Sequence, residues 1–215
     1  MHRKLNITVC ALANLDNNPR PNRMVSFLKD FYNVTFVGFA SSQQSISFYK
    51  IKKNNSFYIK FFRPFFKVFR MHSDLEKLNY QISFNFNSQD LVICHDLELL
   101  PYILKDKKNF QLIFDAREFY PKHFENKLIW RILQSPFQIY LCNRYLKYID
   151  YGITVSNGLK KAYKDKFSIN MDVFYSLPSY IKLPVNKVKE KIRIVHHGSA
   201  TEGRKIEQMI YAMDS

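Results

Sequence analysis

The sequence predicts an α/β fold in which a parallel β-sheet carries helices on both faces. Short apolar runs rich in β-branched and aromatic residues alternate along the chain with longer segments of helical periodicity. The first run, residues 7–13, is apolar throughout, as expected of a parallel strand that is buried on both sides. Strands that alternate with helices are joined by right-handed crossovers, which build a doubly wound sheet.

The elements of the first part of the chain follow from periodicity and from residues that favour helix ends. Strands are predicted at residues 7–13, 34–39, 57–62, 90–94, 110–114, 151–155 and 172–175. Helices are predicted at residues 24–31, 64–84, 127–148 and 158–167, with one more ending at residue 104. Pro64 suits the first turn of its helix, where a missing N–H needs no partner, and Ser156 suits a helix cap. Residues 41–55 are polar and predict a loop, with a short strand at 46–49 as the alternative.

The last part of the chain predicts the start of a second domain. Residues 178–191 are rich in Pro and Lys and lack periodicity, and a fresh strand at 192–195 and helix at 204–213 follow. One strand and one helix cannot bury their own apolar faces. The predicted organisation is a first domain at 1–183, a linker at 184–191, and the first strand and helix of a truncated second domain at 192–215.

The charge of the chain indicates an anionic partner. The 215 residues carry 33 Lys and Arg against 18 Asp and Glu, a formal net charge of +15. Hydrophobic residues at 47% and charged residues at 24% are ordinary for a globular protein and exclude disordered and fibrous classes. Nucleic acid, a membrane surface and phosphorylated small molecules are the candidate partners.

The cysteines and the N-terminus predict a cytoplasmic protein. Cys10, Cys94 and Cys142 lie in apolar stretches with no second Cys or His at metal-ligand spacing, which predicts reduced core residues and no metal site. No apolar run approaches the roughly 20 residues that cross a bilayer. Residues 1–13 share features with a short signal peptide, but their apolar part is barely long enough and starts with a β-branched residue, which favours a buried strand.

Polar residues follow the predicted strand ends, and four stretches there carry a family pattern. They are residues 90–101, 112–121, 149–159 and 195–205. Their order and spacing resemble the retaining GT-B glycosyltransferases of family 4, which include sucrose and glycogen synthases. The resemblance implies a Rossmann-like acceptor-side domain followed by a donor-binding domain. It also implies same-face attack assisted by the leaving phosphate, which requires no protein nucleophile and no cofactor.

His95 is the candidate catalytic residue. It follows the strand at 90–94. An isolated His at a strand end is more often a structural hydrogen-bonding group. The resemblance implies instead that His95 faces the sugar donor, where it would position and stabilise rather than attack.

The acceptor-binding candidates are charged residues in three loops. Arg20 and Arg23 stand near a helix N-terminus, where two arginines can hold an anion, and the alternative is that both are simply solvated. Their loop replaces the paired glycines that are common in the family. Asp96, Arg117 and Glu118 follow later strands. Arg117 stands where commoner members carry His, and its planar fork suits a phosphate or carboxylate; a solvated turn with an Arg117–Glu118 pair is the alternative.

The donor-binding candidates come from the resemblance. It implies that Gly198 ends the first strand of the second domain and that Arg204 grips the donor diphosphate before the following helix. Ser199 stands where many members have a first basic residue, so Lys205 is the candidate substitute. Ser156, at the end of the strand in the third matching stretch, completes the donor-binding set. An ordinary solvated Arg204–Lys205 pair is the alternative.

One segment interleaves aromatic and basic residues. Residues 31–73 contain no acidic residue. Within residues 57–70 lie Phe57, Tyr58, Phe61, Phe62, Phe65, Phe66 and Phe69, together with Lys60, Arg63, Lys67 and Arg70. The half that begins at Pro64 reads as a basic amphipathic helix of the kind that lies on anionic membranes. Interleaving of this kind also suits single-stranded nucleic acid, but no RNA-binding signature accompanies it.

The function predicted is that of a glycosyltransferase, or its N-terminal part. It would transfer a sugar from a nucleotide-diphosphate sugar to a glycan or lipid-linked acceptor in bacterial surface polysaccharide biosynthesis, with peripheral contact to the inner face of the cell membrane. The alternatives are a GT-B nucleotide-sugar epimerase and a non-catalytic basic protein that binds membranes or nucleic acid. The family places its paired donor-holding glutamates downstream of anything present here, so residues 1–215 alone are expected to be inactive.

Overall fold

The computed structural model describes most of the chain and divides it into two compact units. The described residues are 3–105, 107–177, 180–182, 184, 195–196 and 205–213. The units are Met1–Leu177 and Pro178–Ser215. The described part of the second unit contains the helix α8, Ile206–Tyr211, within the range predicted for a helix. Residues 192–194 of the predicted second-domain strand lie outside the described residues, and the assignment of a donor-binding domain stays a prediction.

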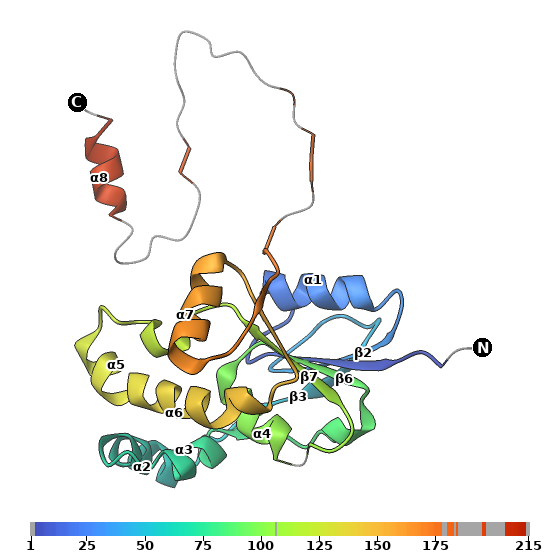
Figure 1. The fold of residues 1–215 in the computed structure, drawn as a ribbon, viewed down its shortest axis with the longest axis horizontal. Coiled ribbons are helices and arrows are strands. Elements are labelled where there is room, and N and C mark those ends of the chain that lie inside the picture. Colours follow the sequence, from blue (N-terminus) through green and yellow to red (C-terminus); the bar gives the residue numbers. More distant parts are fainter. Residues whose placement is uncertain are drawn as a thin grey trace. The chain divides into compact units, whose positions relative to one another are not determined.

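The first unit contains a sheet of seven parallel strands in the order β3-β2-β1-β6-β7-β8-β9 (Figure 1). Its strands are β1 (Asn6–Cys10), β2 (Asn33–Gly38), β3 (Ser47–Lys50), β6 (Leu91–Cys94), β7 (Gln111–Ala116), β8 (Tyr151–Thr154) and β9 (Asp172–Val173). The order runs outward from β1 in one direction and from β6 in the other. The doubly wound α/β fold predicted from the sequence is therefore confirmed, and its topological switch point lies between β1 and β6.

Helices cover both faces of the sheet (Figure 1). The helices of the first unit's described residues are α1 (Pro19–Leu28), α2 (Phe57–Val68), α3 (His72–Leu78), α4 (Leu100–Leu104), α5 (Leu128–Leu133), α6 (Ser135–Tyr145) and α7 (Asn157–Phe167). Short 3₁₀ turns lie at Phe86–Ser88, Leu97–Leu99, Tyr120–Lys122 and Leu146–Tyr148.

The core is split by the sheet into two apolar clusters. Successive strand residues point to opposite faces, so Val9 belongs to the same apolar cluster as Val25 of α1, while Cys10 belongs to the other cluster, together with Leu141 of α6. All three cysteines are buried and unpaired. No helix among the described residues is both long enough and apolar enough to span a bilayer.

The strand predicted at residues 57–62 is wrong, and so is the single helix predicted at 64–84. Residues 57–62 form the first part of α2, which contains Pro64 in its interior and is followed by the separate helix α3. A strand, β5 (Tyr80–Gln81), then pairs antiparallel with β4 (Lys52–Lys53). The many aromatic residues suggested a strand, but their spacing is helical: Phe57 and Phe61 stack four residues apart on the exposed side, while Ile59 is buried.

Two further differences concern shorter elements. The helix predicted at 127–148 is interrupted at Gln134, and α6 begins beside Pro136, which fits the first turn of a helix but not its interior. The short strand considered for residues 46–49 is present as β3. It extends the sheet beyond β2.

Candidate functional site

The loops after β1 and β6 meet at the switch point of the sheet. The backbone N–H of Leu12 donates to Asp96 Oδ2 at 2.7 Å, and the backbone N–H of His95 donates to the carbonyl of Cys10 at 2.9 Å. These contacts fix Asp96 beyond the carboxyl ends of two neighbouring strands. Doubly wound sheets bind their ligands at this edge.

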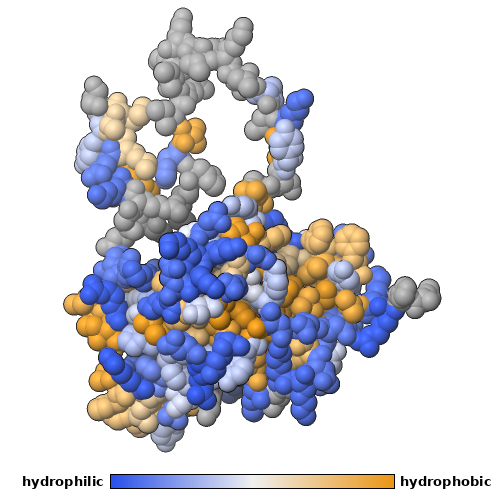
Figure 2. All heavy atoms as spheres, in the orientation of Figure 1, coloured by the Kyte–Doolittle hydropathy of each residue, from blue (hydrophilic) through white to orange (hydrophobic). Residues whose placement is uncertain are grey.

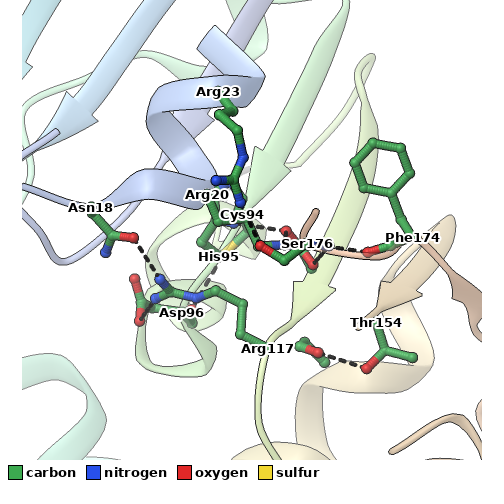
Figure 3. A network of polar contacts seen from close by, with 12 residues as sticks. Asn18, Arg20, Arg23, Cys94, His95, Asp96, Arg117, Thr154, Phe174 and Ser176 are labelled. Carbon is green, nitrogen blue, oxygen red and sulfur yellow. Dashed lines mark hydrogen bonds and ion pairs between the residues drawn. The ribbon is translucent and has the colours of Figure 1, made fainter. Parts of the chain in front are cut away.

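Arg117 joins a third loop to this edge (Figure 3). It follows β7, and its Nη2 donates to Asp96 Oδ1 at 3.2 Å while its Nη1 donates to Asn18 Oδ1 at 3.0 Å. The side chains of Arg117 and Asp96 remain 25% and 18% exposed. Arg117 therefore pairs with Asp96 rather than with its neighbour Glu118, and the Asp96–Arg117 pair stays accessible to a ligand.

A buried cluster of charged groups lies beside this pair. Arg20 makes a two-pronged contact with Asp115, with Nε donating to Oδ2 at 2.6 Å and Nη2 donating to Oδ1 at 2.8 Å. His95 Nδ1 lies 2.9 Å from the same Oδ2, within ion-pair distance but poorly aligned for a hydrogen bond. The side chains of Asp115 and His95 are fully buried, and that of Arg20 is 7% exposed.

The pKa of Asp115 is lowered by the balance of two effects. Burial works to raise the pKa of this carboxyl, but the close imidazole of His95 and the two hydrogen bonds and charge of Arg20 lower it below its ordinary value. Asp115 is therefore a carboxylate at neutral pH. It can hold Arg20 and His95 in fixed positions inside the protein.

Arg20 is neither solvated nor free. Its third nitrogen, Nη1, donates to the carbonyl of Phe174 at 2.9 Å, and its guanidinium lies 5.4 Å from the centre of the Phe174 ring. All three nitrogens are thus occupied. The role of Arg20 in acceptor binding stays a prediction, and it would require Arg20 to give up one of these contacts.

His95 is enclosed on several sides. Its backbone carbonyl accepts a hydrogen bond from the hydroxyl of Tyr120 at 2.8 Å. Within the part of the chain that the structure describes, its Nε2 has no hydrogen-bond partner. The His95 side chain has no exposed surface in this structure, so it would have to become accessible to meet a sugar donor, and that contact stays a prediction.

The remaining predicted residues are spread over the chain. Arg23 is exposed, and its Nη2 donates to the hydroxyl of Ser176 (Figure 3). Glu118 is exposed and contacts His123. Ser156 caps α7, as expected, because its Oγ accepts from the N–H of Leu159 at 3.3 Å.

Of the three donor-binding candidates in the second unit, only Lys205 is among the described residues. Gly198 and Arg204 lie outside the described residues. Lys205 directly precedes α8 and has a left-handed backbone conformation with φ 49°. The donor-binding roles of these residues and of Ser156 stay predictions.

Sequence reasoning missed the residue that organises the site. Asp115 directly follows the strand predicted at residues 110–114 but is not among the predicted site residues, although a single acidic residue after an apolar run is a signal for a buried ion pair. Asn18 and Tyr120 were missed as well. An Asn just before a helix and a Tyr in a turn are too common to stand out. Among the described residues, no group of three or more His, Cys, Asp or Glu could hold a metal ion.

Comparisons with known proteins find structural similarity but no significant sequence match to a family or a curated protein. No protein-family model matches the sequence, and no curated protein matches it at a significant level. Among solved structures, a sucrose-phosphate synthase from Thermosynechococcus elongatus is similar, with a TM-score of 0.49 and 10% sequence identity. The match covers 79% of this chain and 47% of the synthase, so this chain corresponds to less than half of that protein.

Proposed function

We propose that this chain carries the acceptor-side domain of a glycosyltransferase that uses a nucleotide-diphosphate sugar. The observation that carries the proposal is the Asp96–Arg117 pair. Its two members come from two of the stretches that resemble the glycosyltransferase family, and they meet at the edge where doubly wound sheets bind ligands.

The accessible pair and the buried cluster have different tasks in this proposal. Asp96 accepts a hydrogen bond from an acceptor hydroxyl, while the fork of Arg117 donates to an anionic or hydroxyl group of the acceptor. Arg20 and Asp115 act as positioning residues that hold His95 beneath the site. A preorganised site of this kind orients the reacting groups without moving charged side chains during the reaction.

The transfer itself exchanges one bond to the sugar for another. The bond between the anomeric carbon and the diphosphate oxygen breaks, and a bond from the acceptor oxygen to the same carbon forms. The acceptor proton passes to the leaving diphosphate. Gly198, Arg204, Lys205 and Ser156 are the residues proposed to hold the donor, on the strength of the sequence resemblance.

Acceptor and location are finer parts of the same proposal. We infer a glycan or lipid-linked acceptor of bacterial surface polysaccharide biosynthesis, and a cytoplasmic protein that contacts the inner face of the cell membrane. The support for membrane contact is an exposed apolar surface on α2 and the neighbouring α5, at the lower left of Figures 1 and 2. We call it the α2–α5 surface, and it comprises Phe57, Tyr58, Phe61, Phe65, Val68, Phe69, Leu128, Ile129 and Ile132, each at least 46% exposed.

The composition of the α2–α5 surface favours contact with an anionic bilayer over exposure to water. Large apolar patches on a protein surface mark interaction sites. Arg70 after α2, Lys127 before α5 and Arg131 of α5 are exposed, whereas Arg63 and Lys67 are half-buried and line a polar pocket. No acidic residue lies between positions 31 and 73. Aromatic rings inserted among lipid headgroups, flanked by basic side chains, combine apolar burial with attraction to anionic lipids.

One assay separates this function from its alternatives. The protein is expressed from its full reading frame. It is then incubated with radiolabelled sugar nucleotides and an extract of lipid-linked acceptors. Label in the acceptor fraction supports a glycosyltransferase. Label in an epimer of the sugar nucleotide supports the epimerase. If the sugar nucleotides stay intact while the protein binds oligonucleotides in a salt-sensitive way, the proposal is wrong and the chain is a binding module.

A further inference from the structure

A polar pocket lies between α2, the β4–β5 pair and α6, and neither Asp96 nor Arg117 is among its lining residues. Its volume is about 250 Å³. Its polar lining includes Lys53, Arg63, Lys67, Tyr80, Glu98 and Gln134. None of these residues has a role in the proposed transfer, so the proposed transfer does not account for this pocket.

Two cationic side chains of α2 are held in this pocket without matching partners. Arg63 and Lys67 are four residues apart and therefore lie on one side of the helix. The Nε of Arg63 is buried and, among the described residues, has no hydrogen-bond partner. Burial lowers the pKa of Lys67, the charge of Arg63 lowers it further, and Glu98 opposes the shift. An anion in the pocket would relieve both the unpaired donor and the repulsion.

The single carboxylate in the pocket does not balance these cations. Glu98 accepts hydrogen bonds from the hydroxyl of Tyr80 at 3.1 Å and from Nε2 of Gln138 at 3.1 Å. Burial raises the pKa of Glu98, which disfavours its charged form. Arg63 and Lys67 thus face at most one negative charge in the pocket, while Lys53 at its rim is exposed, with its ammonium 4.7 Å from the centre of the Phe39 ring.

We propose that this pocket binds the phosphate monoester of a small polyol. A carboxylate offers two oxygens and one charge, whereas a phosphate monoester offers three oxygens and up to two charges, which matches the two cations Arg63 and Lys67 better. Gln134 Nε2 donates to Glu98 Oε1 at 3.5 Å, which leaves the carbonyl oxygen of the Gln134 amide to accept from a hydroxyl group of the polyol. The volume is smaller than that of sites for drug-sized ligands, which favours a compact molecule.

The phosphate can come from a soluble compound or from a lipid headgroup. The α2–α5 surface makes a lipid plausible as a source, because α2 carries both that surface and two of the pocket's cations. Phosphate recognition is common to both sources. The inference does not depend on sugar transfer, and a failed transfer assay leaves it standing.

The test measures binding of glycerol 3-phosphate by calorimetry, with glycerol as the uncharged probe. In parallel, sedimentation measures binding to phosphatidylcholine vesicles that contain either phosphatidic acid, a monoester, or phosphatidylglycerol, a diester, at matched surface charge. The variants are Arg63→Gln and Lys67→Gln. Lys164→Gln removes one exposed charge on α7 and serves as the matched control. Circular dichroism and thermal melting verify that each variant folds, and a rise in wild-type Tm with glycerol 3-phosphate gives a second readout.

We expect each pocket variant to weaken binding by about tenfold or more, while Lys164→Gln and glycerol show no effect. Loss of glycerol 3-phosphate binding supports a soluble ligand. Loss confined to vesicles with phosphatidic acid supports a lipid headgroup. The inference is overturned if the wild type binds neither glycerol 3-phosphate nor vesicles with phosphatidic acid, or if Lys164→Gln weakens binding as much as the pocket variants. It is also overturned if the pocket variants lose binding to both kinds of anionic vesicle equally, which would indicate general surface charge.

Discussion

At the scale of single residues, Asp115 connects the groups that define the candidate site. Its carboxylate binds Arg20 from α1 and contacts His95 after β6, although Arg20 lies 95 positions away in the sequence. His95, Asp96 and Arg117 could be predicted because polar residues after apolar strands meet at one edge of a parallel sheet. The partner of each could not be predicted, because a single acidic residue does not indicate which distant cation it binds.

Removing the charge of Asp115 should be costly for the fold. Asp115→Asn leaves Arg20 as a buried cation without its partner, so we expect the free energy of unfolding to fall by about 3–5 kcal/mol. Urea denaturation measures the loss. Asp165→Asn, which removes an exposed partner of Lys161, is the control and should leave the stability unchanged. Equal effects of the two changes would show that the buried pair contributes no more than a surface pair.

The same carboxylate predicts a pH dependence of stability. The pKa of Asp115 is lower in the folded protein than its ordinary value of about 3.9. Its stabilisation is therefore present above that value and is lost as the pH falls through the lower, folded-state pKa. The difference in unfolding free energy between wild type and Asp115→Asn should accordingly shrink as the pH falls below about 4. A difference that stays constant at low pH would contradict the lowered pKa.

At the scale of elements, periodicity predicted the sheet well but misjudged α2. The parallel strands are short apolar runs with one plausible structure, whereas residues 57–68 combine the composition of a strand with the spacing of a helix. Pro64 added to the error, because a Pro fits best in the first turn of a helix. Packing of Ile59 and Phe66 toward the core decides in favour of one helix that contains the proline.

Pro64→Ala tests this continuous helix. In a helix interior Pro lacks an N–H and clashes with the preceding turn, so the change should raise the free energy of unfolding by up to about 3 kcal/mol. Pro19→Ala, at the start of α1 where Pro is favourable, is the control and should give no gain. Urea denaturation and far-ultraviolet circular dichroism measure both. A loss of stability in Pro64→Ala would favour a helix that starts at Pro64.

The α2–α5 surface predicts binding to anionic membranes. Phe61→Ser should weaken binding to anionic vesicles by about tenfold, since burying one Phe contributes about 1.5–3 kcal/mol. Phe27→Ser on α1 is a matched control, because Phe27 is 69% exposed and Phe61 is 68% exposed. Vesicle sedimentation measures both variants. Equal binding of the wild type to neutral and anionic vesicles, or an equal loss of vesicle binding in the two variants, would contradict the proposed membrane contact.

At the scale of the whole molecule, the proposed function divides its tasks between two units. The first unit contains the sheet, the Asp96–Arg117 pair and His95. Arg204, the residue proposed to bind the diphosphate of the donor, belongs to the second unit. The sequence order of four short stretches suggested this division. Sequence alone could not supply the contacts between the loops of the first unit, which depend on strand order.

The two units should contribute to different steps. Arg204→Ala removes a charge that meets the leaving diphosphate, so it should lower kcat by about 10²–10³ and weaken the affinity for the nucleoside diphosphate. His95→Ala should lower transfer but leave that affinity nearly unchanged. Calorimetry with the nucleoside diphosphate checks both variants. Loss of nucleotide binding in His95→Ala with retention in Arg204→Ala would reverse the two roles.

The central claim is that this site transfers sugar, and the stoichiometry of the reaction tests it most directly. Nucleoside diphosphate release and sugar incorporation into lipid-linked acceptor are measured together, for the protein expressed from its full reading frame and for its Arg117→Gln variant. We predict one nucleoside diphosphate released per sugar incorporated, no release without acceptor, and a raised acceptor KM in Arg117→Gln. Sugar nucleotide that stays intact or is converted to its epimer, or an Arg117→Gln variant that matches the wild type, would contradict the account.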